Sequence, residues 1–468
     1  MIDRPGVIRA GLAIAAAFLT CSMQACAQSQ AEASPAAAAG VVHTLTQEQR
    51  TLNAESFDAL YNTVKTRHWD PTLGGIDWDG IHRELRPKVE QAATMGEARA
   101  VMRDALSRLG QSHFGIIDRE AYEQIASDDN DPAGVEAAPE SLAGGGDGWT
   151  GIDVRVVNDQ ALVVGVENDS PAQRAGVKMG WIISAIGSKQ VGPMITTLKE
   201  TLEHAEAAEA MIVRGVEAKL SGKVGGSLEI TFLDGDDAEV TRTVGLELPP
   251  GDASKFGNLP EVRTWLKSTR LPGDVGYIRF NYFLDPMRIM PKFETAMQSF
   301  MDAKGIIIDL RGNPGGIGFM ANGMCGFFVD KEGLKLGEMQ SRDTTLNFVI
   351  FPRVNVYTGR VAVLTDGLSL STSEIMAGGL QDLGRARIFG SRTGGAALPS
   401  TVEVLPNGDR LQFVIANYTS ASGRVLEGSG VTPDQEVPLD RATLLSGKDP
   451  VIEAAVSWIG SSHAASNQ

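Results

Sequence analysis

Cysteine is scarce in this sequence, and its scarcity excludes two kinds of stabilising site. Cys21 and Cys26 lie close to the N-terminus, which leaves Cys325 as the single thiol of the rest of the chain. Without a second cysteine, that part cannot form an intramolecular disulfide or a cysteine-rich metal site. Cys325 lies within an apolar run, so a buried thiol is a simpler interpretation than a reactive one.

Positive charge is also in short supply. The 42 Lys and Arg residues against 58 Asp and Glu residues give 42 − 58 = −16. An acidic surface repels phosphate backbones, which argues against a nucleic-acid partner. The hydrophobic share of 43% in 468 residues is enough for a real core. A chain of this length predicts roughly two to four domains.

Long apolar runs are missing, apart from a short one near the N-terminus. Arg4 and Arg9 precede the apolar residues 11–20, and Ala25-Cys26-Ala27 resembles a cleavage site. This order is typical of a signal peptide, here residues 1–27, and the run is too short to span a bilayer. The sequence therefore predicts an exported, periplasmic protein. Attachment of a lipid to Cys26 is the alternative, and it is the only membrane association that we expect.

Downstream of the signal peptide, composition divides the chain into segments. Residues 28–44 are rich in Ala, Ser and Gln and predict a flexible tether. Residues 45–126 predict a helical region, because Phe57, Leu60, Tyr61 and Val64 follow helical spacing. Residues 127–148 are rich in Asp, Ala, Pro and Gly and predict a linker.

The rest of the chain predicts a strand-rich domain over 149–250 and an α/β core over 251–468. Asp234-Gly235, between two extended runs, indicates a hairpin. In the core, residues 305–310 and 361–365 are continuous apolar runs followed by helical segments. This alternation of buried strands and helices is typical of a mixed, largely parallel sheet.

Ser371 is the first candidate for chemistry. It lies between the 361–365 strand and a helix, where a serine is exposed next to backbone N–H groups. Ser371-Thr372-Ser373-Glu374 also fits a capping box, which alone would explain the serine. The Gly-rich turn 311–316 could bind an anion, or it could simply require positive φ at Gly315 or Gly316.

A nucleophilic serine needs a base, and histidine is scarce. His113 lies between small and apolar residues just after a helix, whereas most of the other histidines are expected to be solvated on charged helices or at chain ends. Those others are His43, His68, His82, His204 and His463. Spacing alone does not connect His113 with Ser371.

Three ordered segments resemble the tail-specific or C-terminal processing serine peptidases, and within them the tricorn-core-like branch. They are residues 305–316 (GIIIDLRGNPGG), 367–384 (GLSLSTSEIMAGGLQDLG) and 426–434 (LEGSGVTPD). Residues 149–191 resemble the PDZ domain of these proteases. The resemblance implies an α/β protease core with an N-terminal helical region and an inserted PDZ-like β-rich domain.

The resemblance also implies site residues. The processing branch has a lysine 25 residues after the serine, where this chain has Ala396, so a Ser–Lys dyad is excluded. The tricorn-like branch uses a histidine preceded by a serine, which implies Ser371 as nucleophile, His113 as base and Glu427 as the group that orients His113. Ser112 is implied as a supporting residue. The implied oxyanion hole comprises the N–H groups of Gly316 and Thr372, with Gly315 as the alternative donor.

Within the PDZ-like segment, Gly151 and Ile152 are implied to bind a peptide through backbone N–H groups. Asp153 departs from the pattern, and it would oppose a peptide carboxylate if it faced the pocket rather than solvent. Trp181 is a second departure, at a position where an aspartate is usual.

The predicted function is that of a serine endopeptidase acting through an acyl-enzyme at Ser371, without a metal or organic cofactor. Its partners would be peptide or protein substrates, and the sequence makes no prediction of an oligomer. Two alternatives stay open: an inactive PDZ-type peptide-binding protein, and a hydrolase of non-peptide esters.

Overall fold

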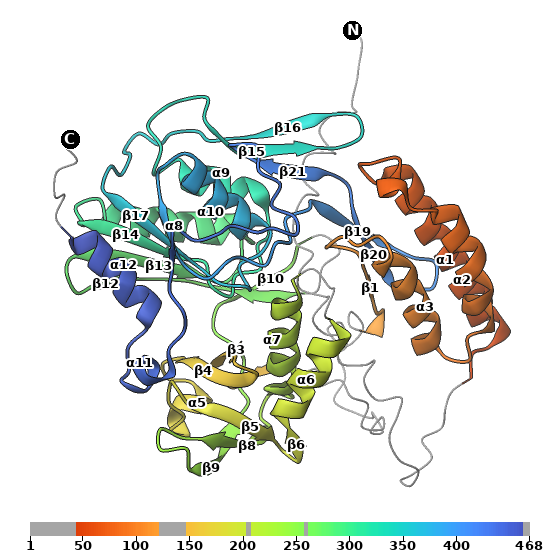
Figure 1. Ribbon diagram of the computed structural model, residues 1–468, viewed down its shortest axis with the longest axis horizontal. Helices are drawn as coiled ribbons and strands as arrows, with labels where there is room; N and C mark the ends of the chain where they lie inside the picture. The colour runs from red at the N-terminus through yellow and green to blue at the C-terminus, as the bar shows by residue number, and fades with distance from the viewer. Residues whose placement is uncertain (1–43, 121–146, 203–206, 257–260, 462–468) are drawn as a thin grey trace.

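The computed structural model describes residues 44–120, 147–202, 207–256 and 261–461 (Figure 1). The expected signal peptide, Cys26, nearly all of the tether and most of the expected linker lie outside these ranges. His43, His204 and His463 also lie outside them. None of the described helices combines the length and apolar character that crossing a membrane requires.

The N-terminal region is helical, as its apolar spacing predicts. It contains α1 (Gln47–Arg67), η3 (Leu73–Gly75), α2 (Trp78–Gln91) and α3 (Met95–Ser107). Thr46 begins α1 with a capping box that includes Gln49. Phe57, Leu60 and Val64 are buried on one face of α1, which packs against α2, and they share a hydrophobic cluster with residues of α2 and α3.

A strand-rich unit follows, which we call the middle unit (residues 147–202 and 207–250). Its sheet has the order β3-β4-β5-β8-β9, with every neighbouring pair antiparallel. The five strands are β3 (Ile152–Val157), β4 (Gln160–Val166), β5 (Ile182–Ile186), β8 (Ser227–Leu233) and β9 (Glu239–Gly245). The predicted hairpin at Asp234-Gly235 joins the last two of them. β3 is an edge strand, so its outer backbone groups are not used by the sheet.

Shorter elements complete the middle unit. They are β2 (Gly148–Trp149), β6 (Lys189–Gln190), β7 (Ser221–Gly222), α5 (Pro171–Arg174), α6 (Val191–Thr201) and α7 (Ala208–Lys219). Trp181 is buried in the core of this unit, where its ring packs against Phe232. Helix α7 packs against the edge strand β3.

The core is built on a six-stranded sheet in which only the first pair is antiparallel. Its order is β12 (Leu266–Leu271), β13 (Val275–Phe280), β14 (Gly305–Asp309), β17 (Arg360–Thr365), β18 (Arg387–Gly390) and β22 (Gln435–Glu436). This arrangement confirms the expected mixed, largely parallel α/β core.

Helices cover both faces of this sheet, which explains the continuous apolar runs. Ile306 and Ile308 face α8 (Pro286–Ser299), α9 (Gly318–Cys325) and α10 (Thr372–Asp382). Ile307 faces the opposite side, against α12 (Pro450–Gly460). A strand buried on both faces needs apolar residues at every position. Cys325, the last residue of α9, is buried in the hydrophobic core, as expected.

Two small sheets were not anticipated from the sequence. One joins β15 (Lys335–Gln340), β16 (Thr345–Val349) and β21 (Asn417–Ser420). The other pairs β1 (Gly115–Ile117) with β20 (Arg410–Val414), which pairs in turn with β19 (Ser400–Val404). The remaining elements are β10 (Asp252–Ser254), β11 (Val262–Thr264) and α11 (Arg441–Leu445). The pairing of β1 with β20 joins the N-terminal region to the core (Figure 1), and β1 begins two residues after His113.

Candidate active site

Ser371 begins α10 in a strained backbone conformation. Its φ of 53° and ψ of −115° lie outside the regions that a non-glycine residue normally adopts. Such strain persists only where the surroundings impose it, and it is common at active sites. The Ser371 N–H donates to the Ala396 carbonyl and to the Glu374 carboxylate, each at 2.9 Å. The capping box expected with Glu374 is present.

The Gly-rich turn packs directly against Ser371. Gly315 and Gly316 have φ values of 98° and 142°, as expected for a turn that requires glycine. A Cβ on Gly315 would lie 2.9 Å from the Cβ of Ser371, and one on Gly316 would lie 2.3 Å from the Phe283 carbonyl oxygen. Side chains at these positions would therefore displace the turn from the serine.

Some backbone N–H groups of the Gly-rich turn and of the start of α10 have a hydrogen-bond acceptor in the protein, and others do not. The Gly315 N–H donates to Asn313 Oδ1 at 2.9 Å. Within the part of the chain that the structure describes, the N–H groups of Gly316 and Thr372 have no protein acceptor. The Thr372 hydroxyl donates to the Gly316 carbonyl at 2.7 Å, which connects the two residues. Gly316 and Thr372 thus have N–H groups free to bind an anion beside Ser371.

His113 lies in a short loop between α3 and β1, with a φ of 64°. Its Nδ1 is 2.6 Å from the Ser112 hydroxyl, which itself donates to Glu427 Oε2 at 3.0 Å. Since that hydroxyl has a single proton, it accepts from Nδ1–H, and the unprotonated ring nitrogen is Nε2. Glu427 Oε1 also accepts the Ser112 N–H at 2.7 Å.

Burial sets the protonation state of this histidine. The His113 side chain is 9% exposed, and its desolvation lowers the pKa to about 3. The imidazole is therefore neutral at pH 7, which is the state that can accept a proton. A carboxylate lies close by, joined to the ring through Ser112.

Residues 395–397 lie between the serine and the histidine groups. The Ala397 N–H donates to Glu427 Oε2 at 3.0 Å, and the preceding Ala396 accepts from Ser371. Ala396 is fully buried in a cluster that includes Leu368 and Leu370, in the loop that leads to Ser371. The structure thus gathers Ser371, Glu427 and the Ser112-His113 pair around one short segment, although their elements are far apart in sequence.

Glu374 has a larger role than the cap that the sequence suggested. The carboxylate is fully buried and accepts from the Thr393 hydroxyl (2.6 Å) and from the N–H groups of Gly395 (2.9 Å) and Ala396 (3.0 Å). Burial raises the pKa of Glu374 to about 7 in spite of these bonds. It therefore ties the 393–396 segment to the first turn of α10.

One expectation about the histidines is wrong for His68. We expected a solvated residue, but it is 1% exposed and its Nε2 lies 2.9 Å from Gln111 Oε1. Its ring also stacks on the ring of Phe114, the residue that follows His113 in the sequence. His68, which directly follows α1, thus contacts residues on both sides of His113 and helps to hold that loop.

Gly151 and Ile152 lie at the start of the edge strand β3, with Gly151 at a φ of 88°. They line a cavity of about 870 Å³ between the middle unit and the core, together with Arg214 of α7 and Gly312 of the Gly-rich turn. Asp153 also lines this cavity, but its carboxylate is paired with two arginines. Its carboxylate binds Arg155 at 2.5 Å and Arg279 of the core at 2.8 Å.

Comparison with known proteins finds two family models that match parts of this chain. Residues 274–437 match the model of Peptidase family S41, and residues 50–107 match that of the Tricorn protease C1 domain. Over residues 274–437, the core of this chain is similar to peptidase family S41. The matched regions contain the core sheet from β13 onward, the Gly-rich turn and Ser371, and most of the helices that precede His113.

Curated relatives in this family include the carboxy-terminal-processing protease of Bartonella bacilliformis. It is 28% identical over 299 residues, which cover 61% of this chain and 60% of that protein. A probable CtpA-like serine protease of Staphylococcus aureus is 26% identical over 291 residues, 61% of this chain and 51% of its own length. This chain thus spans between about half and three fifths of the length of these relatives.

Solved structures share the fold at low sequence identity. The photosystem II D1 C-terminal processing protease has a TM-score of 0.53 and 17% identity, covering 90% of this chain and 99% of its own. Mature CPAF has a TM-score of 0.57 and 14% identity, covering 88% and 97%. These likenesses confirm an α/β protease fold with an N-terminal helical region.

Proposed function

We propose that this chain is a serine peptidase that hydrolyses peptide bonds through an acyl-enzyme at Ser371. The observation that carries the proposal is the hydrogen-bonded series Glu427–Ser112–His113, which ends at a buried neutral imidazole and is joined to the strained Ser371 through residues 395–397. A serine needs an adjacent base to become nucleophilic, and this series supplies one where the Ser–Lys branch has a lysine.

In this mechanism His113 Nε2 takes the Ser371 hydroxyl proton while Oγ attacks the carbonyl carbon of the scissile bond. The negative charge that develops on the carbonyl oxygen is stabilised by the N–H groups of Gly316 and Thr372. Gly315 is the weaker candidate donor because its N–H is bonded to Asn313. Collapse of the intermediate breaks the C–N bond, and the imidazolium returns the proton to the leaving amine. A water molecule then hydrolyses the ester by the same route.

Glu427 acts on His113 through Ser112 in this scheme. The Ser112 hydroxyl donates to Glu427 and accepts from Nδ1–H, so the carboxylate fixes the tautomer that presents Nε2 to Ser371. It also stabilises the imidazolium that forms when the proton moves. Ser112 is therefore part of the relay rather than a peripheral support.

We further propose that the middle unit is PDZ-like and receives peptide segments along β3. Support comes from the free edge of that strand, from the positive φ of Gly151, and from the cavity that both Gly151 and Ile152 line. A peptide would add as a further strand and use backbone N–H groups for its carboxylate. Substrates of this kind, with accessible C-termini, agree with the names of the curated relatives.

Export is also part of the proposal, on the strength of Arg4, Arg9 and the apolar residues 11–20. The mature protein would be periplasmic, either cleaved near Ala27 or anchored by a lipid on Cys26. Mass spectrometry of the mature N-terminus separates the two: a free N-terminus near residue 28 supports cleavage, and an added diacylglyceryl mass on Cys26 supports the anchor.

A fluorophosphonate probe tests the catalytic assignment, because it reacts with an activated serine. Wild-type protein is expected to be labelled, whereas Ser371→Ala and His113→Ala are not. Ser341→Ala, in the exposed turn between β15 and β16, is the matched control and should label as wild type does. Persistent labelling of Ser371→Ala would exclude this nucleophile.

The same experiment addresses the two alternatives. If wild type is folded but unlabelled, a peptide-binding protein without turnover becomes the better explanation. If wild type is labelled but cleaves no bond in an unbiased peptide library, ester hydrolysis is favoured. Cleavage of peptides that is lost with Ser371→Ala supports the peptidase.

A further inference from the structure

A buried carboxylate, Asp366, joins the two loops that build the candidate active site. It begins the loop that leads to Ser371, and its Oδ1 accepts the N–H of Gly312 in the Gly-rich turn at 3.0 Å. The same oxygen accepts the Leu368 N–H at 3.0 Å, and the Ser369 hydroxyl lies 3.2 Å from it. One side chain therefore holds the loop that leads to Ser371 and the turn that bears the Gly316 N–H in fixed relation.

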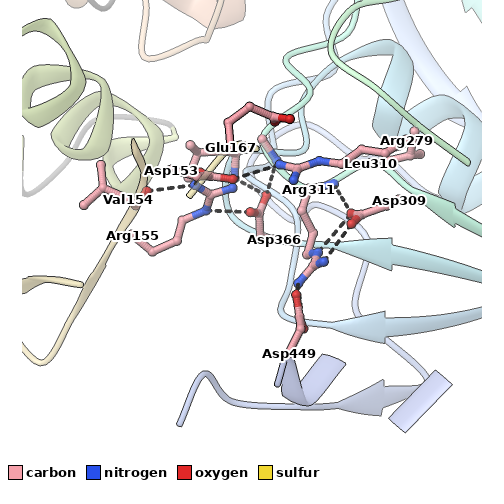
Figure 2. A network of polar contacts seen from close by, with 12 residues as sticks. Asp153, Val154, Arg155, Glu167, Arg279, Asp309, Leu310, Arg311, Asp366 and Asp449 are labelled. Atoms are coloured by element: carbon pink, nitrogen blue, oxygen red, sulfur yellow. Dashed lines mark hydrogen bonds and ion pairs between the residues drawn. The ribbon is translucent and has the colours of Figure 1, made fainter. Parts of the chain in front are cut away.

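The partner of this carboxylate comes from the middle unit (Figure 2). Arg155, on β3, donates from Nε to Asp366 Oδ2 at 2.7 Å. Its side chain is 5% exposed, and Asp366 is 10% exposed, so water screens the pair very little. The guanidinium also lies against the turn itself, since a Cβ on Gly312 would be 3.0 Å from Arg155 Nη2.

The other end of the same guanidinium reaches the free edge of β3. Nη1 donates to the Val154 carbonyl at 2.7 Å and to Asp153 at 2.5 Å. Val154 lies opposite Val163, whose N–H donates to the carbonyl of Trp181 just before β5, so the Val154 backbone groups point away from β4. Arg155 thus contacts both an acceptor that an added peptide strand would use and the carboxylate that holds the catalytic loops.

We propose that Arg155 is a positioning residue, which makes the geometry of the active site depend on the docking of the middle unit. It acts through Asp366: the ion pair keeps that carboxylate oriented toward Gly312 and Leu368, and these bonds keep Gly316 and Ser371 in register. This inference rests on the proposed peptidase function. A displacement of about 1 Å between reacting groups can lower a rate by about 100-fold, so the ion pair has a measurable catalytic effect.

The test compares four variants of the full chain. Arg155→Met removes the charge and keeps an unbranched side chain, Asp366→Asn keeps one acceptor oxygen, and the double variant leaves no unpaired buried charge. Arg441→Met is the matched control, because Arg441 also bridges core and middle unit, through Gly180 and Asp237, without contacting either catalytic loop. Thermal unfolding sets an assay temperature at which every variant is folded.

The readouts are kcat and KM on a short peptide substrate and the rate of fluorophosphonate labelling of Ser371. Arg155→Met is expected to lower kcat and the labelling rate by about 10- to 100-fold with little change in KM, and Arg155→Lys to recover part of the loss. Because both residues act through one contact, the double variant should be no slower than Asp366→Asn. The docking control should stay within about twofold of wild type in kcat.

Three results would overturn the inference. Equal losses in Arg155→Met and Arg441→Met would show a general effect of domain docking. A raised KM with unchanged kcat would confine Arg155 to the peptide-binding edge of β3. Fully additive losses in the double variant would mean that Arg155 does not act through Asp366. Failure of the proposed function itself looks different, since wild-type protein would then not be labelled at all.

Discussion

His113 is buried without charge, and this has a consequence for stability that can be measured. Desolvation lowers its pKa from 6.5 to about 3, so the unfolded chain binds a proton at this residue between these pH values and the folded chain does not. Stability rises with pH wherever the unfolded state binds more protons. The contribution is therefore intact above pH 6.5, and it is lost progressively as the pH falls toward the folded pKa.

The size of the effect follows from the two pKa values. Near pH 5, His113 is almost fully protonated in the unfolded chain and neutral in the folded one. The difference amounts to about 2 kcal/mol of lost stability relative to pH 7, at 1.36 kcal/mol per pKa unit. This is a large fraction of the net stability of an ordinary domain.

The assay is urea denaturation of wild type and His113→Gln near pH 7 and near pH 5. Glutamine keeps an uncharged polar side chain, so the free-energy difference between the two proteins isolates the titration of His113 from other groups. We expect the variant to gain about 2 kcal/mol relative to wild type as the pH falls. If the difference in unfolding free energy between the two proteins is the same at both pH values, the pKa of His113 is not lowered by burial. That result would also refute the claim that His113 stays neutral in the folded protein near pH 5.

Two other groups in the site give predictions of different kinds. Glu374 has a raised pKa of about 7, so its contribution to stability has the opposite sign: it is present at pH 4.5 and is lost as the pH rises through 7. Urea denaturation should show Glu374→Gln gaining about 3 kcal/mol relative to wild type over that range, and no gain would contradict the raised pKa. Ser112→Ala breaks the relay between Glu427 and His113 and should lower kcat about 100-fold with little change in KM. An unchanged kcat would exclude the relay.

The parallel core could be predicted because its cause is local. Strands such as 305–309 and 360–365 are buried on both faces, so their apolar runs and the helices between them appear directly in the sequence. The β15–β16–β21 sheet left no comparable signal. It packs one face against α10 and leaves the other partly exposed, which gives short, mixed patterns.

The candidate site was only partly accessible to sequence reasoning. Ser371 has a local signature, but its distance from His113 in the chain is bridged by the pairing of β1 with β20, which no periodicity predicts. The roles of His113 and Glu427 were predicted from the resemblance of their motifs to a known family, because no local pattern in the sequence connects these residues with Ser371. The contacts of Asp366 and Arg155 were missed altogether, because an ion pair between two units depends on docking.

The replacement of the dyad lysine by Ala396 explains why so much of this site depends on docking. In the Ser–Lys branch, the base follows the serine within the same core. Here Ala396 contributes only backbone contacts to Ser371 and Glu374, and the base that we propose, His113, comes from the N-terminal region. That region is held to the core by β1 and by the buried pair of Arg99 with Asp409 at 2.7 Å. In the mechanism that we propose, catalysis requires two dockings: one brings His113 to the serine, and the other brings Arg155 to the loops that hold the serine in place.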